Sequence, residues 1–156
     1  MTFFVLLLVC FGVAYIPPLA RLLGAPTRRD KMRVAAGLAF ILASIPHFTS
    51  PERYLPMMPP FVPAPEAMIV VSGVAELIGG VGMLIPRTAR IASWWLALLL
   101  LAIFPANVYV AIRGVNAAGL PSSPWYTWSR LPFQALFVWW VLYAGREAPR
   151  APHGTT

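Results

Sequence analysis

The chain has 156 residues, of which 59% are hydrophobic and only 11% are charged, and its mean hydropathy is +0.72. A soluble domain has about 45–50% apolar and about 25% charged residues. A water-soluble fold of this composition would lack the polar side chains to cover its core, so the composition predicts a protein embedded in lipid. The net charge is +7. The basic residues lie between apolar runs and form no continuous stripe, so nucleic acid is not an expected partner.

Five apolar stretches approach the roughly 20 residues of helix that cross the hydrocarbon core of a bilayer. None of them alternates apolar and polar residues as a membrane strand would. The sequence therefore predicts an all-α, polytopic bundle with spans at residues 3–20, 34–48, 67–86, 91–112 and 128–145. The second stretch is short and is expected to borrow length from its basic flank.

The first stretch has two interpretations, a retained helix or a signal peptide. It lacks a positively charged start and a small-residue cleavage site, which favours a retained helix. The pair Pro17 and Pro18 is expected to kink this helix near its inner end or to terminate it. Three regions follow: an N-terminal transmembrane helix at 1–24, a membrane bundle at 30–146, and a disordered cytoplasmic tail at 147–156.

The basic residues separate into two groups of unequal size when the five spans are drawn. The loops predicted on one side hold nine of them: Arg21, Arg28, Arg29, Lys31, Arg33, Arg87, Arg90, Arg146 and Arg150. The other side holds three: Arg53, Arg113 and Arg130. Because cytoplasmic loops carry the excess of Lys and Arg, the N-terminus is predicted outside and the C-terminus in the cytoplasm.

The loop at residues 49–65 contains six prolines, which exclude a regular helix. Its other residues, such as Tyr54, Met57, Met58 and Phe61, are too apolar for a free solvated loop. Two interpretations remain open. The loop packs across the outer mouth of the bundle as a cap, or it rests on lipid headgroups at the interface.

Glu76 is the one acid predicted deep inside a span, about 15 Å from the outer end of the third stretch at 1.5 Å per residue. Ionisable residues within a membrane usually face the bundle interior. Ser72, Gly73 and Gly80 share or border its helix face, and small residues let another helix approach closely. Glu76 is therefore expected to point at a partner helix and not at lipid.

Polar residues from three other spans are predicted at similar depth in the outer half of the bundle. They are His47, Asn107, Arg130 and Gln134, and with Glu76 they form one hypothetical polar cluster. Arg130 is the expected counter-charge of Glu76, because an unpaired buried carboxylate would stay protonated. The cluster has three interpretations: a network that holds the helices in register, a site for a polar-headed ligand, or a proton-handling site.

Catalytic and metal motifs are absent from the sequence. His47, Glu76 and His153 are the obvious mixed metal ligands, and His153 is predicted on the opposite side, so no metal site is expected. No Ser-His-Asp set, P-loop or Cys-x-x-Cys occurs, and the activity stays unassigned.

Six short fragments occur in a characteristic order over about two-thirds of the chain. They are HF at 47–48, MPPFVP at 58–63, SGVAEL at 72–77, LIPRT at 84–88, FPANVY at 104–109 and RLPFQ at 130–134. In this order the chain resembles the DoxX-like family of small membrane proteins. The resemblance implies a bacterial inner-membrane protein with a four-helix core, to which residues 1–24 add a further helix. It also implies a redox context, because the family name derives from a subunit linked to thiosulfate:quinone oxidoreduction.

The chain departs from that family in two respects. It has Ser44, Ile45 and Pro46 where relatives commonly carry a Gly before the His-Phe pair, and Cys10 is its only cysteine. Direct thiosulfate oxidation through a thiol pair is therefore not expected. The leading hypothesis is a redox-associated subunit that binds a quinone or another polar-headed lipid in the cluster.

Two alternatives remain beside this hypothesis. One is a non-catalytic accessory or assembly protein for a larger membrane or periplasmic enzyme, and the other is a small proton-coupled carrier. The expected partners are membrane lipids, with a protein partner or a second copy of the chain as further possibilities.

Overall fold

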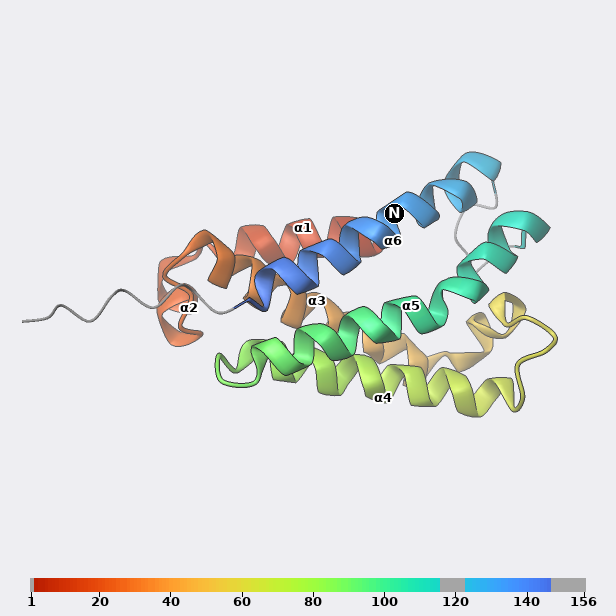
Figure 1. Ribbon diagram of the computed structural model, residues 1–156, viewed down its shortest axis with the longest axis horizontal. Coiled ribbons are helices and arrows are strands. Elements are labelled where there is room, and N and C mark those ends of the chain that lie inside the picture. The colour runs from red at the N-terminus through yellow and green to blue at the C-terminus, as the bar shows by residue number, and fades with distance from the viewer. Residues whose placement is uncertain (1, 116–122, 147–156) are drawn as a thin grey trace, which may run out of the picture.

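The computed structural model describes residues 2–115 and 123–146, and these residues form helices joined by short loops (Figure 1). Within this part of the chain no strand occurs. In chain order the elements are α1 (Thr2–Val13), α2 (Pro17–Leu22), α3 (Arg28–Thr49), the 3-10 turns η1 (Pro51–Arg53) and η2 (Leu55–Met57), α4 (Pro65–Leu84), α5 (Ala89–Arg113) and α6 (Pro124–Ala144). The predicted tail at 147–156 lies outside the described residues.

Helices α3, α4, α5 and α6 form a four-helix bundle, in which α3 packs against α4, α4 against α5, α5 against α6, and α6 against α3. Helix α1 packs along α3 and reaches α6 through its side chains, on the side away from α4 and α5 (Figure 1). Aromatic rings join it to both neighbours: the Phe3 ring is centred 4.9 Å from that of Phe40 on α3 and 4.8 Å from that of Phe137 on α6. Helix α1 therefore covers the α3–α6 seam.

The contact between α3 and α4 is the most extensive in the bundle, and glycines face each other across it. A Cβ added at Gly37 would lie 2.8 Å from the Gly80 carbonyl oxygen, and one added at Gly80 would lie 2.9 Å from the Gly37 carbonyl oxygen. Nearer the other end of the contact, a Cβ at Gly73 would lie 2.5 Å from the Cβ of His47. Small residues at these positions let the two backbones touch.

The bundle has two chemically different ends. We call one the basic end; there α3 and α5 begin and α4 ends. We call the other the cavity end, because a cavity lies inside the bundle near it; there α3 and α5 end and α4 and α6 begin. The nine basic residues predicted on one side lie at the basic end, except Arg150, which is outside the described residues. The three predicted on the other side lie toward the cavity end. Elements from opposite parts of the chain thus place most of the positive charge at one end.

The buried side chain of Arg33 joins helix ends at the basic end of the bundle. Its side chain is only 3% exposed and donates hydrogen bonds to four carbonyl oxygens. Two belong to the last turn of α4, at Met83 (2.7 Å) and Leu84 (2.8 Å), and two follow α2, at Leu23 and Gly24 (both 3.2 Å). A helix end leaves such carbonyls without intrahelical donors, so one guanidinium satisfies two helix ends and ties them to α3.

Each of the last four predicted spans coincides with a helix. Helix α3 begins at Arg28 and so takes its extra length from the basic flank, as expected; a capping box between Thr27 and Asp30 starts it. Among the described residues, α3, α4 and α5 are long and apolar enough to cross a membrane. Helix α6 has 21 residues but is less apolar, since it carries Arg130 and Gln134.

The apolar stretch at residues 3–20 is divided between two helices near Pro17 and Pro18, where a kink or an end was expected. Helix α1 ends at Val13, and a separate short helix, α2, begins at Pro17. Pro17 and Pro18 start this second helix, a position that suits proline because the first N–H groups of a helix need no partner. At 1.5 Å per residue α1 is about 18 Å long, well short of the hydrocarbon thickness of about 30 Å.

The outer face of α5 shows why lipid is the appropriate solvent. Ile91, Trp94, Leu98 and Leu101 recur at helical spacing and are each more than half exposed. Apolar side chains of this size in a continuous stripe are unusual on a soluble monomer. The same helix also contains few charged residues, which agrees with a face that contacts lipid.

The α3–α4 contact generates a stability prediction. Gly80→Ala should lower the free energy of unfolding by about 1–3 kcal/mol, because its methyl group would force two backbones apart. The measurement is the apparent melting temperature of the detergent-solubilised protein. Gly12→Ala is the matched control, since nothing lies within 4 Å of a Cβ there, and it should leave the melting temperature unchanged or slightly raised. Equal melting temperatures for wild type and Gly80→Ala would contradict the close contact.

Candidate functional site

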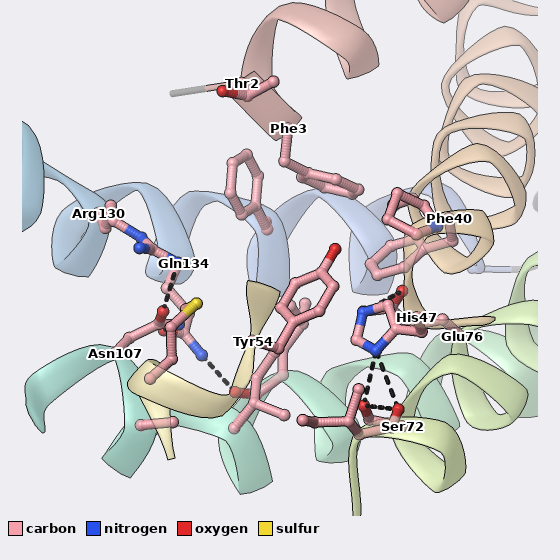
Figure 2. Close-up of a pocket in the computed structure, with 18 of the residues that line it drawn as sticks. Thr2, Phe3, Phe40, His47, Tyr54, Ser72, Glu76, Asn107, Arg130 and Gln134 are labelled. Atoms are coloured by element: carbon pink, nitrogen blue, oxygen red, sulfur yellow. Dashed lines mark hydrogen bonds and ion pairs between the residues drawn. The ribbon is translucent and has the colours of Figure 1, made fainter. Parts of the chain in front are cut away.

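A cavity of about 440 Å³ lies inside the bundle near its cavity end. Side chains from α1, α3, α4, α5, α6 and the two 3-10 turns line it, so no single pair of helices forms it. All five residues of the predicted cluster are among its lining: His47, Glu76, Asn107, Arg130 and Gln134. The structure divides them, however, into two hydrogen-bonded groups on opposite sides of the cavity (Figure 2).

The first group, the α3–α4 cluster, consists of His47, Ser72 and Glu76. The Nδ1 atom of His47 lies 2.9 Å from the carbonyl oxygen of Ile69 and 3.1 Å from the Ser72 hydroxyl oxygen, which itself donates to Ile69 at 2.8 Å. The Nε2 atom of His47 lies 3.6 Å from Oε2 of Glu76. Side chains on a helix lean toward its N-terminus, so Glu76 reaches back along α4 to the level of His47.

The contacts of His47 determine where its protons are. A backbone carbonyl can only accept a hydrogen bond, so Nδ1 must carry the proton it shares with Ile69. The remaining nitrogen, Nε2, is then the position that gains or loses a proton next to Glu76. The histidine and the carboxylate can therefore exchange one proton while the pair as a whole stays neutral.

The second group, the α5–α6 cluster, is a chain of donors that runs from Arg130 to the backbone of α5. Nη2 of Arg130 donates to Oδ1 of Asn107 at 2.9 Å, and Nδ2 of Asn107 donates to Oε1 of Gln134 at 2.8 Å. Gln134 in turn donates to the carbonyl oxygen of Leu100. Each member orients the next, so the arginine is held at the cavity wall by α5 as well as by its own helix.

Tyr54, from the proline-rich loop, stands between the two clusters (Figure 2). Its ring stacks on His47 with centroids 4.3 Å apart and planes tilted by 19°. Burial raises the pKa of the Tyr54 hydroxyl, and the nearby Glu76 carboxylate acts in the same direction, so the phenol stays neutral at physiological pH. Met57 and Met58 also line the cavity, whereas Phe61 is 76% exposed. The first half of the loop caps the cavity, and the second half faces outward.

Each cluster leaves one buried polar atom without a hydrogen-bond partner. These atoms are Oε2 of Glu76, a residue that is 8% exposed, and Nη1 of Arg130. The expectation that Arg130 pairs with Glu76 is wrong: the carboxylate lies beside His47, and the guanidinium binds Asn107. An acceptor and a donor without a hydrogen-bond partner thus belong to residues that line one cavity, and groups of this kind are costly unless a partner satisfies them.

Between the clusters the cavity wall is mainly apolar and rich in aromatic rings. Phe3 comes from α1, Phe40 from α3, and Phe133 and Phe137 from α6. Across residues 2–115 and 123–146, no three His, Cys, Asp or Glu side chains lie together as metal ligands would. The site therefore offers flat apolar surfaces, hydrogen bonds and one exchangeable proton.

The sequence analysis placed Ser72 on the helix face of Glu76 but did not include it in the polar cluster. The shared face was the signal that could have added it. Tyr54 carried no such signal, because its position over His47 depends on how the loop folds back. The contribution of α1 to the cavity through Thr2 and Phe3 likewise follows from tertiary packing.

A family described as a domain of unknown function, DUF8561, matches residues 35–144. The chain belongs to this family. The match runs from within α3 to the last residue of α6, so it contains both clusters and the capping loop but neither α1 nor α2. No curated protein matches the chain, and no solved structure matches it.

The α5–α6 cluster can be tested by removing its middle member. Asn107→Leu should destabilise the protein by about 1–3 kcal/mol, because Arg130 and Gln134 would each lose a partner inside the bundle. The measurement is the loss of monodisperse protein after heating in detergent. Ser129→Ala is the control, since that hydroxyl donates to the Tyr126 carbonyl oxygen of its own helix, and it should have little effect. An unshifted transition for Asn107→Leu would show that the donor chain adds nothing to stability.

Proposed function

We propose that this chain is a multi-pass protein of the bacterial inner membrane that binds a quinone or another polar-headed lipid in the cavity between its two clusters. The observation that carries the proposal is a pair of buried atoms without a hydrogen-bond partner, Oε2 of Glu76 and Nη1 of Arg130, on residues that line opposite sides of one largely apolar cavity. A polar head between them would supply both missing hydrogen bonds. The aromatic walls would hold the rest of the head.

The size and surroundings of the cavity suit such a ligand. Its volume of about 440 Å³ falls within the roughly 300–1,000 Å³ of small-molecule sites. Leu42, on the outside of α3, is 46% exposed and also belongs to the cavity lining. The apolar lining is thus continuous with the surface that faces lipid, and an acyl or isoprenoid tail can remain there while the head is bound.

In this proposal all five apolar segments lie in the membrane. Helices α3 to α6 cross it, including α6, whose 21 residues reach about 31 Å at 1.5 Å per residue. Helix α1 is embedded over only about 18 Å of the depth. The basic end faces the cytoplasm, because Lys and Arg are retained on that side, and the cavity end faces outward.

The resemblance to the DoxX-like proteins supports a redox context for this site. The fragments that carry the resemblance contain the polar residues of both clusters, with His47 and Glu76 on one side and Asn107, Arg130 and Gln134 on the other. We propose that the chain is a subunit that holds the lipid for a redox enzyme. The chain itself contributes binding, orientation and an exchangeable proton at His47 and Glu76.

The test is native mass spectrometry of the protein purified in a mild detergent. Wild type should carry one polar-headed lipid or take up an added quinone. Arg130→Ala should reduce occupancy about 10- to 100-fold, since a hydrogen bond to a charged group is worth about 1.5–3 kcal/mol. Arg113→Ala is the matched control, because that arginine is exposed at the end of α5 and is not part of the cavity lining; it should retain the ligand.

One outcome would remove the basis of the proposal. If wild type carries no lipid and binds no quinone on titration, the cavity is a structural feature and a purely accessory or assembly role is the better account. Stable co-purification with a larger membrane or periplasmic enzyme would then support that account.

A further inference from the structure

We infer that the cavity selects a head that carries hydroxyl groups, a hydroquinone or related phenol, over the oxidised quinone. In the inferred complex one hydroxyl group contacts Oε2 of Glu76, and a second oxygen accepts a hydrogen bond from Nη1 of Arg130. This inference rests on the proposed ligand site and adds the chemical form of the ligand. It follows from the donors and acceptors that the two clusters leave unused.

The α3–α4 cluster is the part that discriminates between the two forms. Because Nδ1 of His47 is held by Ile69, one exchangeable proton remains for Nε2 of His47 and the carboxyl group of Glu76. When that proton is on His47, the carboxylate can only accept a hydrogen bond. When it is on Glu76, the carboxylic acid can donate one. A hydroxyl group both donates and accepts, so it satisfies Glu76 in either state.

A quinone carbonyl only accepts, so it satisfies Glu76 in one of these two states. In the other state the carbonyl oxygen would face an ionised carboxylate with no proton between them, which is repulsive in a site of low dielectric constant. Binding an oxidised quinone therefore restricts the pair to one protonation state, whereas binding a hydroquinone leaves both accessible. The free energy of binding should favour the hydroquinone for this reason.

The α5–α6 cluster accepts either form and so provides anchorage without selection. Nη1 of Arg130 is a permanent donor, and both a carbonyl and a hydroxyl oxygen can accept from it. Asn107 and Gln134 fix the other edge of this arginine, so the free N–H keeps its direction. Arg130 therefore determines where the head lies, and Glu76 determines which form binds better.

The walls indicate that the head is a planar ring. Tyr54 already places one phenol ring in this space, stacked on His47 (Figure 2). Phe3, Phe40 and Phe137 add further flat faces around the cavity, and aromatic rings pack well in offset or edge-on contact with one another. A hydroquinone combines such a ring with hydroxyl groups at both ends.

The experiment compares three probes that share one short alkyl chain: a benzoquinone, its hydroquinone, and the dimethyl ether of that hydroquinone. The ether keeps the ring and both oxygens but has no O–H group and no redox chemistry. Dissociation constants are measured under argon by quenching of tryptophan fluorescence in wild type, Glu76→Gln and Glu66→Gln. Glu66 is the matched control, because it is exposed in the first turn of the same helix and is not part of the cavity lining.

Wild type and Glu66→Gln should bind the hydroquinone at least about twofold more tightly than the quinone or the ether, because each of those excludes one of the two protonation states of the pair. In Glu76→Gln the amide both donates and accepts in its single charge state, so the three constants should agree within the error of the measurement. Equal wild-type affinities for all three probes, or tighter quinone binding, would overturn the inference and leave the lipid site intact. If none of the probes binds to wild type, the proposed ligand site itself fails. The wild-type ratios remain decisive even where Glu76→Gln does not fold.

Discussion

The close approach of α3 to α4 is the constraint on which the cavity depends. Gly37 and Gly80 let the two backbones touch, and Gly73 leaves room for the His47 side chain between the helices. Only at this separation can His47 reach the Ile69 carbonyl on one side and Glu76 on the other. The packing of small residues thus determines which nitrogen of the histidine is protonated, and through it the chemistry of one whole side of the cavity.

The two ends of the bundle are built on opposite principles. At the basic end Arg33 satisfies four carbonyl groups at once, which fastens α2, α3 and α4 together. Toward the cavity end α3, α5 and α6 each contain an internal proline, at Pro46, Pro105 and Pro132. A proline removes one helical hydrogen bond and bends the helix, which a membrane tolerates where neighbouring groups or a cavity take up the change. The basic end is therefore held together by side-chain hydrogen bonds, whereas prolines bend the helices toward the cavity end.

The division of the polar residues into two clusters changes what the site can do. A direct ion pair between Arg130 and Glu76 would have neutralised both groups and left a structural network. In the fold each is instead held by its own neighbours, Asn107 for the arginine and His47 for the carboxylate, with Tyr54 between them. Each then keeps one buried atom without a hydrogen-bond partner. A ligand can complete this arrangement, because no internal pair has already done so.

Composition and hydrophobic periodicity were sufficient to predict a helical membrane bundle, the approximate limits of its last four helices, the end at which positive charge gathers, and five of the polar residues that line the cavity. These features are local or additive: a span is read from consecutive residues, and a buried polar residue is conspicuous among apolar ones. A break near Pro17 and Pro18 was expected from the sequence, whereas the partners of Glu76 and Arg130 and the position of Tyr54 were decided only by the tertiary structure. They depend on the rotation of each helix about its axis and on the fold of a proline-rich loop, which are set by packing between segments far apart in the chain.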